Sequence, residues 1–556
     1  MAKRSRVRTN GVQANPALTL SPRHDPASGR GGLSAWDIAC ATFLASLLLW
    51  LVLPSLGPQS LYRDDAWQVL IARQRNWADV ARFGVTAPGF GLLLSAWLAA
   101  SGFSEAAAQV PSLVAGALGP PGLYLLARTI GLSRLAALLA GLLLAVTSSQ
   151  VVESARVKPF TLDALFAIIL SALVLAVLRD PARRGRWLAL AGSGGLALLV
   201  SAQAALPAAS GLMACLFAAR RCSSSVRLWG TATVACFGVA MLSWYLIVVG
   251  SSGREALHEY WAQSFLPWDA GLRSMARAAV KITDAFFDHA LNGIPFAWVL
   301  GVPLAGIGAV LGSRVLDADR TAVLVLPFIQ AWLLNSAGRV PLGGGRIDLY
   351  LLPFLFVLLA LPLEWLKARR PAFALALGYS AICIIVLAAV WQRQSRYPRE
   401  DLRSLTASVE DLARPEDSIV VYPETSYPYA VYSRFQSRLE PDPLSMTGFT
   451  PVSNDARVDM LPGFQFGTGG PVFHRGERRC VELLKAAIAR ARRRGGAVWI
   501  VQSLLFPEDQ LPELDETLRQ SGFEVEGAQS ALSAKATRWK QRRGPGAPTV
   551  GHPRES

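Results

Sequence analysis

The sequence is poor in charged residues, in cysteine and in histidine. Only 17% of its 556 residues are charged, against 52% hydrophobic residues, and this balance excludes a soluble globular chain of that length. Four of the six cysteines, Cys40, Cys215, Cys236 and Cys383, lie in apolar runs, which excludes a disulfide framework. The five histidines have no metal-ligand spacing, so no metal is predicted firmly, and a divalent metal stays open.

Acidic residues are also scarce relative to basic ones. The chain has 39 Asp and Glu against 55 Lys and Arg, a formal net charge of +16. The basic residues fall in short clusters between apolar runs, where the positive-inside rule explains them without a nucleic-acid partner. We therefore expect a polytopic membrane protein. Residues 1–33 are rich in Arg, Ser, Pro and Gly and predict a disordered basic cytoplasmic tail, not a signal peptide.

The number of membrane spans depends on the apolar segment 86–101, TAPGFGLLLSAWLAAS. If this segment crosses, the basic clusters at 179–186, 220–227 and 367–371 lie outside, against the charge bias that orients membrane proteins. If it lies along the outer surface, all three clusters become cytoplasmic. We therefore predict an interfacial segment and about eleven transmembrane helices, with a short span as the alternative.

This topology predicts an all-α transmembrane domain followed by a small extracytoplasmic α/β domain. The transmembrane domain covers 34–392 and has a large first outer loop, 57–106. The segments EDSIVVYPETS and GGAVWIVQSLLFP indicate buried strands within 393–530. Residues 531–556 read as a disordered basic tail. The predicted location is the cell inner (plasma) membrane, with the N-terminus cytoplasmic and 393–530 outside.

Ionisable residues of both signs gather on the predicted outer side. This placement is informative, because charge near a membrane is costly, and it suits a site for a charged, amphipathic substrate. The residues concerned include Asp64, Asp65, Glu153, Arg156, Lys158, Asp163, Arg346 and Asp348.

Asp64 and Asp65 follow the first apolar run directly. Neighbours at i and i+1 do not face each other on a helix, so they cannot clamp one bond from opposite sides. We expect one carboxylate to point into a cavity and the other to hold the loop or a partner. Apolar surroundings would push the pKa of the first toward neutrality, as a general base requires. The alternative is a helix N-terminus favoured by acids.

Three basic residues are candidates for binding a phosphate. Arg346 follows three glycines in PLGGGRIDLYLLP, where the backbone can approach a ligand and a guanidinium can donate two parallel hydrogen bonds. Lys158 adds a point charge. Each of Lys158, Arg156 and Arg346 has the alternative of snorkelling from a span end. Asp163 lies just inside a span and is expected to pair with Lys158 or Arg156, in a structural ion pair or a catalytic role.

Four segments together resemble a known family. DDAW, then TAPGFGLLLSAWLAASGFSEAAAQVPSLVAGALGPPGLYLLARTIG, then SSQVVESARVKPFTLDALFAIIL, then GGGRIDLYLLP are similar to the dolichyl-phosphate-mannose-protein mannosyltransferase/ArnT-like group of GT-C glycosyltransferases. The similarity covers 35–180, with a weaker echo at 338–366. It implies a base role for Asp64 with Asp65 in support, and it implies that Lys158 binds the carrier phosphate.

The resemblance implies a membrane enzyme, a hexosyl- or pentosyltransferase. Family members move a sugar from a polyprenyl-phosphate donor to an acceptor hydroxyl outside the cytoplasm, usually with inversion. The acceptor is a glycan, a lipid or a protein, membrane lipid surrounds the chain, and Glu153, Asp163 and Asp348 are expected to support the site. Two alternatives stay open: a lipid or oligosaccharide transporter, whose paired broken helices are not visible here, and a receptor or assembly factor acting through the C-terminal domain.

Overall fold

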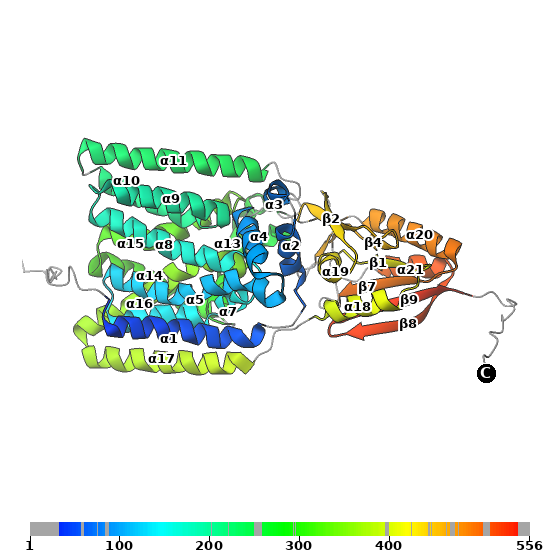
Figure 1. The fold of residues 1–556 in the computed structure, drawn as a ribbon. Helices are drawn as coiled ribbons and strands as arrows, with labels where there is room; N and C mark the ends of the chain where they lie inside the picture. The colour runs from blue at the N-terminus through cyan, green and yellow to red at the C-terminus, as the bar shows by residue number, and fades with distance from the viewer. Residues whose placement is uncertain are drawn as a thin grey trace, which may run out of the picture.

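The computed structural model consists of a bundle of long helices joined to a small strand-containing domain (Figure 1). Of the predicted tails at 1–33 and 531–556, residues 1–32 and 543–556 lie outside the described residues. The structure describes residues 33–56, 60–74, 76–83, 88–201, 203–220, 222–249, 258, 260–292, 294, 296–394, 400–423, 425–442, 445, 447–462, 464–466, 473–475, 477–503 and 512–542.

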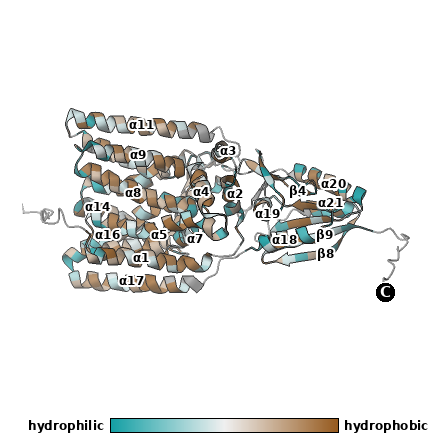
Figure 2. Ribbon diagram, in the orientation of Figure 1, coloured by the Kyte–Doolittle hydropathy of each residue, from teal (hydrophilic) through white to brown (hydrophobic). Residues whose placement is uncertain are grey.

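The bundle is built from long apolar helices that lie side by side (Figures 1 and 2). Helix α5 packs against α1, α6 and α8, and α16 packs against α6, α14 and α17. The helices are α1 (Ala35–Val52), α5 (Glu105–Ile130), α6 (Arg134–Val146), α8 (Phe160–Arg179), α9 (Arg184–Val200), α10 (Ala205–Ala219), α11 (Ser224–Val249), α14 (Ala297–Val315), α15 (Ala318–Ser336), α16 (Leu352–Arg369) and α17 (Pro371–Gln394).

The outside of the bundle is apolar. Helices α11 and α17 lie at opposite edges of the bundle in Figure 1, and both expose large apolar side chains such as Leu228, Val239, Ile384 and Leu387. A continuous exposed apolar surface is unfavourable in water and favourable in lipid. The surface therefore agrees with an integral membrane protein.

The predicted count of about eleven spans is wrong. Within the described residues, seven helices are long and apolar enough to cross a membrane, or eight if α6 and α7 (Ser148–Ser154), bent by 57°, form one span. Helices α9 and α10 have 17 and 15 residues and so reach only about 25 Å at 1.5 Å per residue, short of a hydrocarbon core of about 30 Å. Helix α15 carries Asp319 and Arg320 in its first turns. From apolar content alone, α9, α10 and α15 are each predicted to be a span.

Short helices collect at the end of the bundle that adjoins the strand-containing domain (Figure 1). Helix α4 has 14 residues, too few to cross a bilayer unbent; whether it lies at an interface stays a prediction. The short helices here are α2 (Arg63–Ala72), α3 (Trp77–Phe83), α4 (Pro88–Ser101) and α7, and the 20-residue α13 (Gly271–Ala290) lies near them. The 3₁₀ helices are η2 (Leu53–Ser55), which contacts α1, η3 (Ala262–Ser264) and η4 (Trp268–Ala270), which contact α13, and η5 (Arg346–Leu351), which contacts α7 and α8.

The C-terminal domain has a five-stranded sheet in the order β4-β1-β7-β9-β8. Strands β4, β1 and β7 are parallel, whereas β9 is antiparallel to β7 and to β8. Two small antiparallel pairs, β2–β3 and β5–β6, accompany it. The elements are α18 (Leu402–Leu412), β1 (Ser418–Val421), α19 (Ser426–Tyr432), β2 (Ser437–Pro441), β3 (Phe449–Ser453), β4 (Val458–Met460), β5 (Phe464–Phe466), β6 (Phe473–Arg475), α20 (Glu477–Arg494), β7 (Val498–Ser503), α21 (Pro512–Gln520), β8 (Phe523–Ala531) and β9 (Ala534–Gln541).

The sheet corrects the predicted domain boundary at residue 530. Strand β9 pairs with β7 along Val498–Ser503 and with β8, so the sheet extends to Gln541 and the segment 531–541 is not a disordered tail. Its alternating pattern AKATRWKQ buries Ala534, Ala536 and Trp539, the period-2 signal of a strand. The high basic content of the segment had obscured this alternation.

The domain packs directly on α2, the helix that carries Asp64 and Asp65. Helix α19 follows β1 and contacts α2, and one buried apolar cluster includes Val69 and Phe90 from the first loop together with Tyr427 and Phe449 from the domain. Polar contacts join the same surfaces: Tyr432 Oη accepts from Leu61 N at 2.6 Å. The first loop therefore has its core completed by residues some 350 positions later in the chain.

Candidate active site

Asp64 and Asp65 lie in the first turn of α2, and both are buried, with 1% and 3% of their surface exposed. A carboxylate in this position interacts favourably with the helix N-terminus. The N-cap residue is Tyr62, which makes no side-chain capping bond. Burial of two adjacent carboxylates requires cationic or hydrogen-bonding partners, and each aspartate has its own.

Asp65 fixes the turn that precedes α8. Its carboxylate accepts from Arg156 Nε at 2.7 and 3.0 Å and from the Val157 backbone N at 2.9 Å. The Arg156 guanidinium also lies 4.5 Å from the centre of the Tyr62 ring. Asp65 is thereby committed to Arg156 and to the backbone, which is the loop-holding role expected for one member of the acidic pair, whereas Arg156 Nη2 has no hydrogen-bond partner among the described residues.

Asp64 is paired differently. Arg346 Nη1 donates to its Oδ2, and Arg63 Nε lies 3.6 Å from Oδ1. Burial alone would raise the pKa of Asp64, but the positive charges of Lys158, Arg346 and Arg63 outweigh burial and hold the pKa well below its usual range. The prediction of a pKa near neutrality is therefore wrong, because the sequence did not reveal how many cations surround this carboxylate.

Lys158 is a buried ammonium without a carboxylate in ion-pair contact among the described residues. Its Nζ lies 3.6 Å from the centre of the Trp67 ring, a cation–π contact strengthened by burial. Its backbone is held by Ser112, whose hydroxyl donates to the Lys158 carbonyl at 2.7 Å. Burial lowers the pKa of Lys158 to about 8, although Asp64 opposes the shift. With 3% of its surface exposed, this lysine does not snorkel.

The glycine loop before η5 places Arg346 against Asp64. Gly343 and Gly345 have φ of 79° and 68°, the left-handed region that favours glycine. Asp348 fastens this loop, since its Oδ2 accepts from Gly343 N at 2.7 Å. The Arg346 guanidinium lies 5.8 Å from the Phe160 ring centre and 6.0 Å from that of Trp261.

The other predicted supporting residues differ in their surroundings. Glu153, on α7, is 5% exposed and close enough to Arg156 and Arg346 to interact electrostatically. Its Oε2 has no hydrogen-bond partner among the described residues. The predicted pairing of Asp163 with Lys158 or Arg156 is wrong, because Asp163 accepts from Ser201 Oγ. Lys158 and Arg156 are the only cations near Asp163 in the sequence. The sequence does not indicate that the Ser201 hydroxyl, at the end of α9, lies next to it.

Sequence reasoning missed Trp67 and the residue behind it, Tyr427. Trp67 lies three residues after Asp64, on the same face of α2, and this spacing within DDAW could have identified it. Tyr427 meets the Trp67 ring edge-on, with centroids 6.5 Å apart. The Tyr427 hydroxyl bonds to Ser445 and Thr447 at 2.7 and 2.9 Å. The C-terminal domain therefore reaches Lys158 through two aromatic rings.

No metal centre is evident in the described part of the chain, where no three His, Cys, Asp or Glu side chains gather closely enough to hold an ion. What the geometry does assemble is a buried carboxylate beside three cations, with several polar atoms still available. Asp64 Oδ1, Glu153 Oε2, Arg156 Nη2 and Asp348 Oδ1 are buried and have no hydrogen-bond partner among the described residues. Such a site can bind an anion and accept a proton next to it.

Comparison with known proteins supports the expected fold class. The family model for dolichyl-phosphate-mannose-protein mannosyltransferase matches residues 85–248. No curated protein sequence matches the chain significantly. The structure of ArnT from Cupriavidus metallidurans bound to undecaprenyl phosphate is similar over 91% of this chain and 98% of that one, with 15% identity and a TM-score of 0.52.

A second solved structure has the same kind of likeness. The apo oligosaccharyltransferase of Archaeoglobus fulgidus is similar over 84% of this chain and 70% of that one, with 13% identity and a TM-score of 0.50. At these identities the likeness is one of fold. Together with the family match, it confirms the predicted resemblance to GT-C glycosyltransferases of the mannosyltransferase/ArnT-like type, with apolar membrane helices and a C-terminal domain.

Proposed function

We propose that the chain is a membrane glycosyltransferase that moves a sugar from a polyprenyl-phosphate donor to an acceptor hydroxyl on the extracytoplasmic side. The family match and the ArnT-like fold support this class of reaction. The ArnT structure was solved with undecaprenyl phosphate bound, the type of carrier that we assign to the donor here. The bundle end that carries Asp64 then faces away from the cytoplasm, as the charge bias of the loops predicts.

The single observation that carries the proposal is the state of Lys158. A buried ammonium without an ion-paired carboxylate is costly, and a site of this kind gains free energy from a bound anion. The Trp67 ring covers one side of the ammonium and leaves its N–H donors available. Arg346 lies close by, with five guanidinium donors of which Asp64 uses one. A phosphate between Lys158 and Arg346 satisfies both.

The proposed reaction is a single displacement. Asp64 accepts the proton of the acceptor hydroxyl, and the hydroxyl oxygen forms a bond to the anomeric carbon as the bond from that carbon to the phosphate oxygen breaks. The electron pair leaves with the phosphate, whose negative charge grows as it departs. Lys158 and Arg346, with Arg156 behind them, therefore bind the leaving phosphate more strongly than the donor. A single displacement inverts the anomeric configuration.

Donor binding also prepares the base in this scheme. The pKa of Asp64 is held low by Lys158, Arg346 and Arg63, so the carboxylate is ionised but weakly basic. A phosphate that shares the charges of Lys158 and Arg346 offsets part of their field and raises the pKa of Asp64 toward its usual value. Proton removal from the acceptor is thus favoured only when the donor is present.

Asp64→Asn tests the proposal in purified protein in lipid nanodiscs. We expect the variant to bind polyprenyl-phosphate hexoses or pentoses as the wild type does, because the cations remain, while transfer falls by about 10²–10⁴-fold. Transfer at the wild-type rate would refute the base assignment. The transporter alternative predicts movement of the lipid across the bilayer with the sugar–phosphate bond intact, so analysis of the lipid product separates the two.

A further inference from the structure

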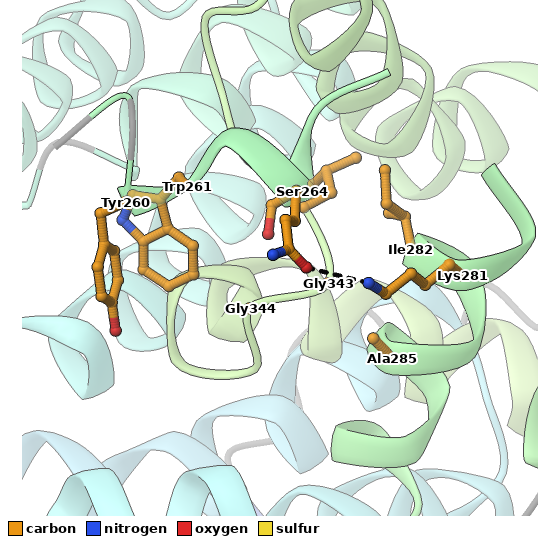
Figure 3. A pocket seen from close by; sticks show the side chains of 10 residues that line it. Tyr260, Trp261, Ser264, Lys281, Ile282, Ala285, Gly343 and Gly344 are labelled. Carbon is orange, nitrogen blue, oxygen red and sulfur yellow. Dashed lines mark hydrogen bonds between the residues drawn. The ribbon is translucent and has the colours of Figure 1, made fainter. Parts of the chain in front are cut away.

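A pocket of about 190 Å³ lies beside the glycine loop that positions Arg346 (Figure 3). It is smaller than the roughly 300–1,000 Å³ of pockets for drug-sized ligands, so it has room for a single ring and not for a chain of rings. Its lining comes from the segment around η3, from α13 and from the glycine loop. The lining residues are Tyr260, Trp261, Gln263, Ser264, Lys281, Ile282, Ala285, Leu342, Gly343 and Gly344.

The walls of the pocket are held by a buried amide. Asn335, with 0% of its surface exposed, donates to the carbonyls of Ser264 and Val340 at 2.6 and 3.0 Å and accepts from Leu266 N at 3.2 Å. Leu342 N also donates to the Ser264 carbonyl, at 3.1 Å. The segment around η3 and the glycine loop are therefore fastened to each other, which makes this a built cavity.

Close approach of the glycine loop shapes the floor. A Cβ at Gly344 would lie 2.6 Å from the Trp261 ring, and a Cβ at Gly343 would lie 2.9 Å from the Ile282 carbonyl oxygen. Both distances are too short for a real side chain. The two glycines thus allow the indole and α13 to stand directly against the loop that ends in Arg346.

The lining residues are suited to a sugar that carries a negatively charged group. The Tyr260 and Trp261 rings meet at 89° with centroids 4.9 Å apart, and they offer flat apolar surfaces. Figure 3 shows the Trp261 ring on one side of the pocket and Lys281 on the other. Lys281 Nζ is hydrogen-bonded to Gln263 Oε1 at 3.1 Å. An aromatic platform with a few polar groups opposite fixes the orientation of a small ligand.

We propose that this pocket binds the acceptor, through a sugar unit that carries an acidic substituent. The sugar ring stacks on Trp261, and its carboxylate or phosphate group bonds to Lys281. Trp261 is also the ring that lies 6.0 Å from the Arg346 guanidinium carbon, and Arg346 donates to Asp64. A unit stacked on this ring is therefore next to the base and the phosphate-binding arginine. The inference rests on the proposed function and specifies its acceptor.

Binding of simple sugars without any donor tests this proposal. The probes are methyl β-D-glucuronide and glucose 6-phosphate, which are anionic, and methyl β-D-glucoside, which is neutral and of similar size. Saturation-transfer NMR on the full chain in nanodiscs gives the dissociation constants. We expect the anionic sugars to bind about fivefold to tenfold more tightly than the neutral one, less than a buried charge-assisted hydrogen bond provides, because Lys281 is exposed to solvent.

Variants divide the contributions of the ring and of the charge. Lys281→Gln is expected to remove the preference for anionic sugars, Lys281→Arg to retain it, and Trp261→Leu to abolish binding of both kinds. Arg273→Gln, an exposed cation on the same helix and outside the pocket lining, is the matched control and leaves the preference unchanged. Equal binding of neutral and anionic sugars, no binding of either, or a preference that survives Lys281→Gln would each overturn the proposal.

The same measurement separates this proposal from the assignment of the reaction. Asp64→Asn is expected to bind the sugar probes as the wild type does, because Asp64 is not in the pocket lining. If Asp64→Asn transfers at the wild-type rate while Lys281→Gln loses the anionic preference, the assignment of Asp64 as the base is refuted and the assignment of the pocket as the acceptor site is supported. If Asp64→Asn loses transfer completely and the wild type binds no sugar probe, the base assignment is supported and the acceptor pocket is refuted.

Discussion

Replacing each member of the acidic pair by asparagine should have opposite consequences for donor binding, although the two residues are adjacent. The Asp65 carboxylate accepts from Arg156 Nε and from the Val157 backbone N, and Asp65→Asn leaves the partly buried guanidinium without its ion pair. Breaking a buried pair from one side costs about 3–5 kcal/mol. We expect a value near the lower end, because Glu153 and Asp64 also interact electrostatically with Arg156.

The loss at Asp65 should appear in stability and in donor binding together. The turn that Asp65 fastens carries Lys158, so a loosened turn displaces the ammonium from the phosphate site. Asp64→Asn breaks no backbone contact and leaves the surrounding cations in excess. Because it also removes the buried partner of Arg346 and Arg63, we expect a loss of stability here too. Unlike Asp65→Asn, however, it should bind the donor at least as tightly as the wild type while losing transfer.

The assay combines thermal unfolding, donor binding and transfer by each variant in nanodiscs. Asp79→Asn, on the neighbouring α3 and only partly buried, is the matched control and should resemble the wild type in all three. Unfolding of Asp65→Asn at the wild-type temperature, together with normal donor binding, would contradict the fastening role of Asp65. Loss of donor binding by Asp64→Asn to the same extent as by Asp65→Asn would contradict the different roles of the two residues equally.

Three further outcomes follow from the site. Because burial lowers the pKa of Lys158 to about 8, its positive charge is present below that pH, and kcat/KM for the donor should fall as the pH rises through about 8; Lys158→Arg should remove this decline. Trp67→Leu removes a buried cation–π contact of about 2 kcal/mol and should raise the donor KM by up to about thirtyfold with a smaller change in kcat, measured by initial rates. Asp163→Asn retains an acceptor for Ser201, so its transfer rate should stay within about twofold of the wild type, in contrast to Asp64→Asn.

The fold class was accessible from sequence because its main signals are local. Apolar runs predict helices, and loop charges predict which segments share a side; α2, α3, α4, α7 and α13 indeed lie at or near one end of the bundle (Figure 1). The span count was not accessible, since apolar content does not distinguish a helix of 15 or 17 residues from one that crosses. The end of the sheet was missed because a basic strand resembles a basic tail.

The site was only partly accessible for a different reason. The sequence identified Asp64, Asp65, Arg156, Lys158 and Arg346, and the structure brings them together. Their pairing could not be predicted, because it depends on contacts up to 282 residues apart. For the same reason the pKa of Asp64 was expected to move in the wrong direction.

The late completion of the first loop has a consequence for biosynthesis. The apolar surface of α2 is covered by Tyr427 and Phe449, which the ribosome adds long after Asp64. A nascent or truncated chain that ends before about residue 400 has all the charged residues of the site but no partner for Trp67 and its neighbours. Such a fragment should expose the apolar surface of α2, be degraded by quality-control proteases and lack transfer activity. Catalysis therefore begins only when the C-terminal domain has folded against the first loop.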